Sequence, residues 1–299
     1  MSVAIGIDLG GTNIKGILID EAGEVLKQHY IPTHDDPQGL WRENVKDMVR
    51  YLQNYWQEPI STVGLSAPGL PNDTNSCIAF LPNRLNGLEN YVWGDYFGLP
   101  TYIINDAHAA LMAEAAFGAA RDNRNVVLLT LGTGVGGGIL LNGELYQGLS
   151  QMAGHLGHLC LNTSDDECSI VGIPGSLEYA IGNYSVAKRS RNRFTSTWEL
   201  VEAYRKGDHF ATYVWLHSVR SLAIALSSLI NAFSPERIVL AGGITLADDA
   251  LFEPLRSFLD IYEWRPGDKQ TPVVQAQFGD MAGAIGAASF ALRKKDGGK

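Results

Sequence analysis

Short apolar runs and longer amphipathic stretches alternate along the 299-residue chain. The apolar runs have the length of β-strands, whereas the amphipathic stretches carry apolar side chains near helical spacing. In the first part of the chain this pattern predicts helices at residues 40–56 and 107–120, and strands at residues 3–8, 14–19, 24–31, 60–65 and 102–104. Alternating strands and helices are typical of an α/β fold.

The rest of the chain repeats this alternation. Two apolar runs, residues 126–129 and 139–141, flank a glycine-rich turn, and an irregular stretch at residues 146–175 follows them. Several helices come next, the longest at about residues 208–233. The pattern then predicts strands at residues 236–240 and near 272–276, and a final Ala/Gly-rich helix at residues 281–292.

The glycine-rich turn, Thr130-Leu-Gly-Thr-Gly-Val-Gly-Gly-Gly138, is the most distinctive stretch of the sequence. Glycine takes positive φ readily and leaves no Cβ between the backbone amides and a ligand. Successive N–H groups in such a turn form a concave site suited to phosphate. Taken alone, the turn is equally compatible with a β-hairpin that binds nothing.

The turn has an earlier copy 122 positions upstream, in which Leu9, Gly10, Gly16, Ile17 and Leu18 match Leu131, Gly132, Gly138, Ile139 and Leu140. Each copy reads strand, glycine turn, strand, and leads to a second tight turn of the kind that joins hairpin strands. A unit repeated at this distance indicates two duplicated domains rather than a solenoid. We expect lobes at residues 1–120 and 121–280, with residues 281–299 packing back onto the first. Two such hairpins would grip a nucleotide in a central cleft, as in the actin-like ATPase (ribonuclease H-like) fold.

Composition and charge argue against several classes of partner. The net charge is −9 at pH 7, so neither nucleic acid nor a membrane is an expected partner, because nucleic acids and anionic membranes both require clustered Lys and Arg. No apolar run approaches the ~18–20 residues of a membrane helix, and we expect no signal peptide. Three cysteines are too few for a disulfide framework. A cytoplasmic location is expected.

Six motifs in order resemble the ROK family, a group of bacterial glucokinases, fructokinases, N-acetylmannosamine kinases and sugar-responsive repressors. They are Asp8-Leu-Gly-Gly-Thr12, Ser66-Ala-Pro-Gly69, Asn105-Asp106-Ala107, Leu131-Gly-Thr-Gly-Val-Gly-Gly-Gly138, Gly154-His-Leu-Gly-His158 and Leu240-Ala-Gly-Gly243. A lone glycine turn is a weak signal, but this series covers nearly the whole chain. The resemblance implies ATP- and magnesium-dependent phosphorylation of a hexose or hexose derivative, and a homodimer.

Phosphoryl transfer needs positioning, charge neutralisation and an acceptor for the proton of the attacking hydroxyl. Asp106 follows a predicted strand and opens a predicted helix, where it could be a general base or, equally from sequence alone, a helix N-cap. The resemblance favours catalysis and implies that Asn105 holds a neighbouring sugar hydroxyl. Asp8 would act on magnesium, often through water, because Mg²⁺ keeps waters and takes few carboxylates.

Both glycine turns and a third Gly-Gly pair are the predicted nucleotide contacts. The turns would cradle the phosphates, and the pair would let the nucleoside approach the backbone, with helix–strand packing as its alternative. Lys15 could add positive charge near the phosphates, although a solvated face is as plausible. The candidate contacts are Gly10, Gly11, Thr12, Gly132, Thr133, Gly134, Gly242 and Gly243.

The resemblance also implies residues for the sugar, in addition to Asn105. Glu178 matches a glutamate that contacts sugar in the family, although an exposed charge in the first turn of a helix is the alternative. The remaining candidates are Ser66, Pro68, Gly69, Asn83, His155 and His158.

Two departures from the family pattern affect these expectations. Many members bind structural zinc through Cys-x-Cys-Gly-x-x-Gly-Cys-x-Glu and a histidine, but here Ser169, Val171 and Ser176 stand where the thiolates should be. Structural zinc needs four ligands, which His158 and the off-register Cys168 cannot supply, so we predict no zinc. A metal assay that finds stoichiometric zinc in the purified protein would refute this.

The second departure is His155, which stands where the family has the glutamate of Glu-x-Gly-His. Neutral histidine accepts one hydrogen bond and donates another, whereas a carboxylate accepts only. Either the preferred sugar differs from glucose or His155 contacts glucose with reversed polarity.

Other functions fit less well. A sugar-sensing regulator would carry a DNA-binding segment before the first strand. A non-catalytic sugar-binding protein would not need Asp8, Asp106 and both glycine turns, and a chaperone-like or filament ATPase would not need Asn105-Asp106. The identity of the sugar, the phosphorylated hydroxyl and the preference for ATP over another phosphoryl donor stay open.

Overall fold

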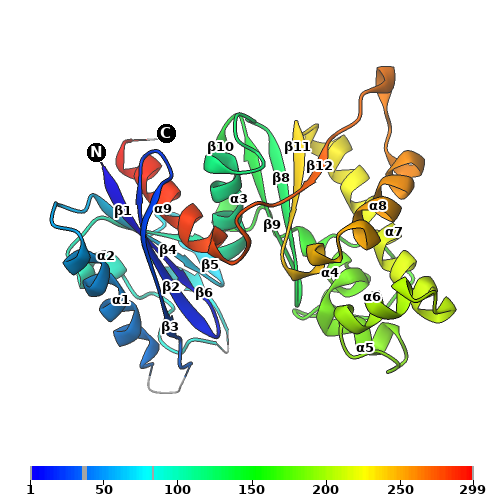
Figure 1. The fold of residues 1–299 in the computed structure, drawn as a ribbon, viewed down its shortest axis with the longest axis horizontal. Helices are drawn as coiled ribbons and strands as arrows, with labels where there is room; N and C mark the ends of the chain where they lie inside the picture. Colours follow the sequence, from blue (N-terminus) through cyan, green and yellow to red (C-terminus); the bar gives the residue numbers. More distant parts are fainter. Residues whose placement is uncertain (1, 36–38, 83, 298–299) are drawn as a thin grey trace. The chain divides into compact units, whose positions relative to one another are not determined.

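The computed structural model describes residues 2–35, 39–82 and 84–297. Asn83, one of the predicted sugar contacts, lies outside the described residues. The chain forms two compact units (Figure 1). Unit 1 comprises Met1–Asp122, Leu145–Ala153 and Gln277–Lys299, and unit 2 comprises Asn123–Glu144 and Gly154–Ala276. The segment 145–153, which we placed with the second lobe, therefore packs with unit 1.

Unit 1 is built on a five-stranded sheet in the order β3-β2-β1-β4-β7. Its central strand β1 is antiparallel to β2 and parallel to β4. These inner strands read as apolar runs because both of their faces are covered, whereas the edge strand β3 alternates between partly buried and exposed positions. The strands are β1 (Val3–Leu9), β2 (Asn13–Asp20), β3 (Val25–Pro32), β4 (Thr62–Ala67) and β7 (Thr101–Asn105).

Helices cover both faces of this sheet. The amphipathic α1 (Trp41–Tyr55) packs on one face, and α9 (Ala282–Lys295) crosses the strands and packs against α3 (Asp106–Phe117) (Figure 1). Small residues allow this close approach, because a Cβ on Gly64 would lie 1.9 Å from the carbonyl oxygen of Ala287. The unit also contains a short helix, α2 (Trp93–Phe97), and a small hairpin of β5 (Leu70–Pro71) and β6 (Ile78–Phe80).

Unit 2 contains a second five-stranded sheet, in the order β10-β9-β8-β11-β12. Its strand β8 is antiparallel to β9 and parallel to β11, so β8 and its neighbours repeat the directions of β1, β2 and β4. The strands are β8 (Val126–Leu131), β9 (Val135–Leu141), β10 (Glu144–Leu145), β11 (Arg237–Ala241) and β12 (Val273–Gln275).

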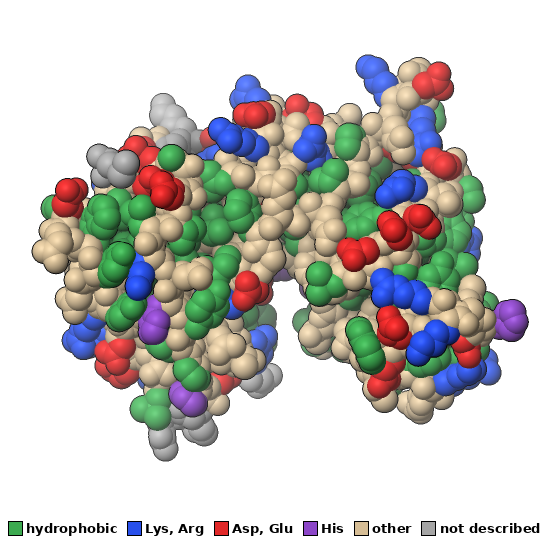
Figure 2. All heavy atoms as spheres, in the orientation of Figure 1, with side chains coloured by type: hydrophobic (Ala, Val, Ile, Leu, Met, Phe, Trp, Pro, Cys, Tyr) green, Lys and Arg blue, Asp and Glu red, His purple; other side chains and the backbone are tan. Residues whose placement is uncertain are grey.

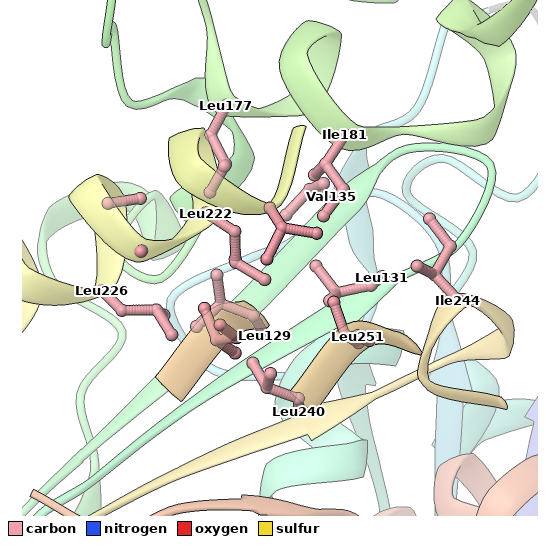
Figure 3. Close-up of a cluster of buried hydrophobic side chains, with 14 of the residues drawn as sticks. Leu129, Leu131, Val135, Leu177, Ile181, Leu222, Leu226, Leu240, Ile244 and Leu251 are labelled. Atoms are coloured by element: carbon pink, nitrogen blue, oxygen red, sulfur yellow. The ribbon is translucent and has the colours of Figure 1, made fainter. Parts of the chain in front are cut away.

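One large hydrophobic core holds unit 2 together. Leucine side chains of β8, β11 and α7 meet Leu177 and Ile181 of α4 in its centre (Figure 3). The long helix α7 is apolar enough to cross a membrane by length and composition alone, but 61% of its apolar window is buried within the protein, as expected of a core helix. The helices are α4 (Leu177–Ile181), α5 (Val186–Arg189), α6 (Thr197–Arg205), α7 (His209–Phe233) and α8 (Asp249–Tyr262).

Charges on the surface are mixed in sign. On the face drawn in Figure 2, acidic and basic side chains are interspersed over the described residues.

Candidate functional site

The first cluster of functional candidates lies where β7 ends and α3 begins. Asn105 is the N-cap of α3, and its Oδ1 accepts the amides of Ala107 at 3.0 Å and His108 at 3.4 Å. Asp106 is the first residue of the helix and is exposed, with one carboxylate oxygen 2.8 Å from the amide of Ala107. The capping role that was an alternative for Asp106 is thus performed by its neighbour.

Asp8 lies at the end of β1 in the same unit. The hydroxyl of Ser66 donates to its Oδ1 at 3.0 Å. Burial raises the pKa of Asp8 to about 6, while Lys15 and the Ser66 hydrogen bond lower it and the carboxylates of Asp106 and Asp280 raise it further. Asp106 is thus an electrostatic neighbour of Asp8, although burial is the largest cause of the raised pKa.

Lys15 is directed at these acids. Its ammonium lies 3.8 Å from Asp8 Oδ2 and 3.6 Å from Asp280 Oδ2, and it donates to the carbonyl oxygen of Asp280 at 2.6 Å. The Lys15 side chain is only 17% exposed. The structure thus places this lysine against a carboxylate cluster rather than on a solvated face.

The predicted sugar contacts of unit 1 differ in whether their polar groups remain available to a ligand. Ser66 is fully buried, and its hydroxyl is bound to Asp8, so it supports that carboxylate. Asn105 Nδ2 donates to the carbonyl oxygen of Gly69 at 3.1 Å, which leaves one N–H of the amide for a ligand. Pro68 and Gly69 are partly exposed.

Each glycine turn keeps two consecutive amides available. The amide of Gly10 donates to Asn13 O at 3.1 Å, and that of Gly132 donates to Gly134 O at 3.0 Å, so both close their own turns. The next two amides of each turn donate to no residue that the structure describes. The available amides are those of Gly11, Thr12, Thr133 and Gly134.

Glu178 is buried behind the second turn. Its carboxylate accepts the amides of Val135 and Ile170, each at 3.1 Å, and its exposed fraction is 7%. A Cβ on Gly134 would lie 2.3 Å from Glu178 Oε2. The alternative of an exposed surface charge does not describe this residue, which joins the glycine turn to the loop before α4.

A pocket of about 400 Å³ opens beside the second turn within unit 2. Gly132, Thr133 and Gly243 line it, whereas Gly242 lies behind them with φ +92° and would place a Cβ 2.4 Å from Leu131 O. Gly242 therefore serves strand packing and Gly243 faces the pocket. The lining that we did not predict comes from α6 and its N-cap, from the 3₁₀ turn Asn183–Ser185 and from the 3₁₀ turn Gly243–Ala247. These residues are Asn183, Ser196, Thr197, Trp198, Val201, Glu202, Arg205, Ile244, Leu246 and Ala247.

These pocket residues carry no sequence motif. The sequence signal that could have found them was Trp198, a large aromatic residue two positions after the N-cap Ser196, and its side chain is 73% exposed in the structure. An exposed tryptophan beside a pocket is a candidate surface for a flat ring.

Comparison with known proteins decides the family. A sequence profile of the ROK family matches residues 4–294. The glucokinase of Thermotoga maritima is 30% identical over 98% of this chain and 98% of its own length.

The chain belongs to the ROK family. The structure of a ROK hexokinase from Thermus thermophilus matches 96% of this chain and 97% of its own, at 29% identity and a TM-score of 0.85. A ROK glucokinase from Streptomyces griseus, solved with glucose and AMPPNP, matches 98% of this chain and 100% of its own, at 26% identity and a TM-score of 0.77. The actin-like ATPase fold expected from the paired glycine turns is thus confirmed. The family also includes the xylose repressor of Bacillus spizizenii, which is 26% identical over 97% of this chain and 77% of its own length.

The ROK zinc position does not fit zinc in this chain. Ser169 Oγ accepts the amide of Ile173 at 3.0 Å, and Ser176 Oγ accepts the amide of Tyr179 at 3.2 Å. Neutral hydroxyls are poor substitutes for thiolates, and here they act as turn and helix caps. Hydrogen bonds therefore hold this loop at the position where the resemblance led us to look for zinc ligands.

Two of the predicted sugar contacts, His155 and His158, lie side by side. The rings of His155 and His158 are stacked, with centroids 6.2 Å apart and an interplanar angle of 11°. Nδ1 of His158 is buried and has no hydrogen-bond partner among the described residues.

The carboxylates of unit 1 suit magnesium better than any softer metal. Mg²⁺ prefers oxygen ligands and needs one or two carboxylates, with water and phosphate completing its shell. Asp8 provides such an oxygen and has Asp106 as its electrostatic neighbour.

Proposed function

We propose that this ROK protein transfers the γ-phosphoryl group of ATP to a hydroxyl of a hexose or hexose derivative. The observation that carries the proposal is the relation between Asp106 and Asp8. An exposed carboxylate at the start of α3 and a buried carboxylate at the end of β1 lie close enough to shift a pKa. The glucokinase relatives, which match nearly the whole chain, support the same reaction.

Asp106 is the proposed general base. It would accept the proton of the attacking hydroxyl, while the remaining amide N–H of Asn105 fixes a neighbouring hydroxyl. The other proposed sugar contacts are Pro68 and Gly69 of unit 1 and His155, His158 and Glu178 of unit 2. Glu178 would use the lone pairs that the amides of Val135 and Ile170 leave free.

The nucleotide would occupy the pocket beside the second glycine turn. Its base would stack near Trp198, and Gly243 would let the nucleoside approach the backbone. The amides of Thr133 and Gly134, and those of Gly11 and Thr12, would bind phosphate oxygens. A magnesium ion, held by Asp8 mostly through water, would neutralise developing charge on the phosphates.

Each unit thus supplies proposed residues for both substrates. We infer that the units act as the two lobes of one enzyme and that their similar sheets descend from a duplicated ancestor. A homodimer in the cytoplasm is the proposed state in the cell.

A coupled assay of ADP release tests the proposal. Wild-type protein and Asp106→Asn would be compared over hexoses, amino-hexoses and polyols, with ATP and magnesium. We expect turnover with at least one sugar and a loss of about 10²–10⁴-fold in kcat for the variant, the usual contribution of a general base. Intact ATP binding without turnover on any sugar would overturn the proposal.

A second candidate is a sugar-binding regulatory protein without catalysis. His155, in place of the family glutamate, and the repressor relative favour it. Calorimetry with the same sugars separates the two functions, because a regulator would bind a sugar that it never phosphorylates. His155→Glu refines the result: an unchanged ranking of sugars would show that this position does not set specificity.

A further inference from the structure

Unit 2 contains a second pocket that the proposed reaction does not use. Its volume is about 420 Å³, within the range of small-molecule sites. Its walls come from the loop before α4, from α4 itself, from Arg189 at the end of α5, and from α7. It shares no lining residue with the pocket beside the second glycine turn.

This pocket is electropositive in a chain of net charge −9. Arg189, Arg220 and His217 line it, and among the lining residues Asp165 is the one carboxylate that opposes them. Neither arginine forms an ion pair with a residue that the structure describes. Cations without carboxylate partners attract an anionic ligand.

Arg189 is held in place by neutral groups. It donates to the hydroxyls of Ser185 and Ser218 and to the carbonyl oxygen of Gly182. These bonds use three of its five N–H groups. Burial lowers its pKa to about 10, and the neighbours that oppose this shift are two tyrosines rather than a carboxylate. An anion beside the two remaining N–H groups would stabilise the charged form of Arg189 that burial disfavours.

Arg220 and its neighbours give the pocket both a second guanidinium group and aromatic rings. The Arg220 Nε donates to the hydroxyl of Tyr262 at 2.6 Å, which leaves its two terminal nitrogens for a ligand. Tyr213 stacks on His217, with ring centroids 6.4 Å apart. Aromatic faces suit the C–H surface of a sugar, and forked guanidinium groups suit phosphate.

We propose that this second pocket binds a phosphorylated sugar, the product class of the proposed reaction, and thereby weakens binding of the unphosphorylated sugar. The site is distinct in its residues from the proposed sugar contacts. The binding step is independent of the proposed function, and only the effect on turnover rests on it.

Helix α4 provides the physical connection. Tyr179 and Ala180 line the pocket, whereas Glu178 of the same five-residue helix accepts the amides of Val135 and Ile170. Arg189 also binds Gly182 O, at the C-cap of α4. A phosphate that draws Arg189 toward itself would loosen this cap and shift Glu178. The expected kinetic effect is a higher KM for sugar with little change in kcat.

Calorimetry with glucose 6-phosphate, inorganic phosphate and glucose tests the binding step in the full chain. Arg220→Gln removes a proposed ligand contact, and Ser221→Phe fills the pocket from α7. Arg256→Gln, an exposed arginine of α8 outside the pocket, is the matched control. We expect glucose 6-phosphate to bind wild type and Arg256→Gln equally, Arg220→Gln at least tenfold more weakly, and Ser221→Phe not at all.

Several results would overturn the proposal. These are no binding of glucose 6-phosphate to wild type, equal binding to wild type and Arg220→Gln, or inorganic phosphate binding as tightly as the sugar phosphate. Circular dichroism would confirm that each variant folds. If Ser221→Phe fails to fold, the comparison of Arg220→Gln with wild type still decides the proposal. If the protein turns sugar over, added glucose 6-phosphate should raise the sugar KM of wild type more than that of Arg220→Gln.

Discussion

The carboxylate of Glu114 accepts the backbone amide of Gln277 at 2.7 Å, across 163 positions of sequence. The same oxygen accepts the amide of Phe278 at 3.0 Å, and the other oxygen accepts the amide of Ala119 at 2.7 Å. Glu114 has no exposed surface. One buried side chain of α3 therefore anchors the segment where the chain returns to unit 1 after completing unit 2.

Replacing Glu114 by Gln should lower the free energy of unfolding. Glutamine keeps one accepting oxygen, but its NH₂ group replaces the second carboxylate oxygen. A backbone amide that donates to that oxygen in wild type would then face another donor. A buried donor left without a partner costs about 1–3 kcal/mol. Urea denaturation would measure the loss. Glu253→Gln, at an exposed position of α8, should change stability by less than about 0.5 kcal/mol, and a similar loss in both variants would contradict the anchoring role.

Asp8 should make stability depend on pH. Because burial raises its pKa from 3.8 to about 6, the folded protein holds this proton more tightly than the unfolded chain does. The stability that the proton contributes is complete below about pH 4 and is lost as the pH rises through 6. Asp8→Asn cannot lose a proton, so relative to wild type it should gain up to about 3 kcal/mol between pH 4 and pH 8.

Denaturation with a metal chelator present would measure this difference. In a separate measurement without chelator, added magnesium should stabilise wild type at pH 8 and leave the stability of Asp8→Asn unchanged. A constant difference between the two proteins across this pH range would show that the carboxylate is not perturbed.

Two alanine substitutions in the second glycine turn should behave differently. At Gly134 the new Cβ would meet the Glu178 carboxylate at 2.3 Å, whereas at Gly132 it would meet nothing within 4 Å. Gly134→Ala should therefore lower the melting temperature and raise the KM for sugar by displacing Glu178. Gly132→Ala should melt like wild type, yet raise the KM for ATP about tenfold, or roughly 1.4 kcal/mol, if a phosphate approaches this backbone. An unaltered KM for ATP would remove the turn from the nucleotide contacts.

Trp198 should contribute to nucleotide affinity. Base stacking on an aromatic side chain is worth about 1–3 kcal/mol when measured by alanine substitution, so Trp198→Ala should weaken ATP binding at least about fivefold. Trp264 is the matched control, because it is equally exposed, at 73%, and lies outside the pocket. ATP titrations followed by calorimetry would compare the two variants. Equal affinities would place the base elsewhere.

The sequence predicted those helices and strands whose apolar pattern lies within the segment itself. Strand β1 was expected at residues 3–8 and lies at Val3–Leu9, and the helix expected at residues 40–56 is α1 (Trp41–Tyr55). Both follow from apolar periodicity, which the chain carries within each segment. The final helix continues to Lys295, three residues beyond its expected end. Its last three residues are charged, so the apolar periodicity used for the prediction stops before the helix does.

Features that depend on distant partners were not predictable in this way. Lys15 meets Asp280 across 265 positions, and no local pattern distinguishes such a lysine from one on a solvated strand. The roles of Ser66 and Asn105 also needed structure, because a hydroxyl or an amide can face a ligand or bind its neighbours. Here the Ser66 hydroxyl binds Asp8 and the Asn105 amide binds the carbonyl oxygen of Gly69. The α6 lining of the first pocket is a further example, since its residues gain a role only when the helix packs beside the glycine turn.

The packing of α9 on β1 and β4 constrains how the protein can be made. Its small residues complete the core of unit 1 against Gly6 and Gly64, yet they are synthesised only after every residue of unit 2. During translation the sheet of unit 1 must wait, with one apolar face uncovered, until the whole of unit 2 has left the ribosome. A nascent chain stopped shortly before Ala282 should therefore be the species that depends most on chaperones, and α9 supplied as a separate peptide should rescue it.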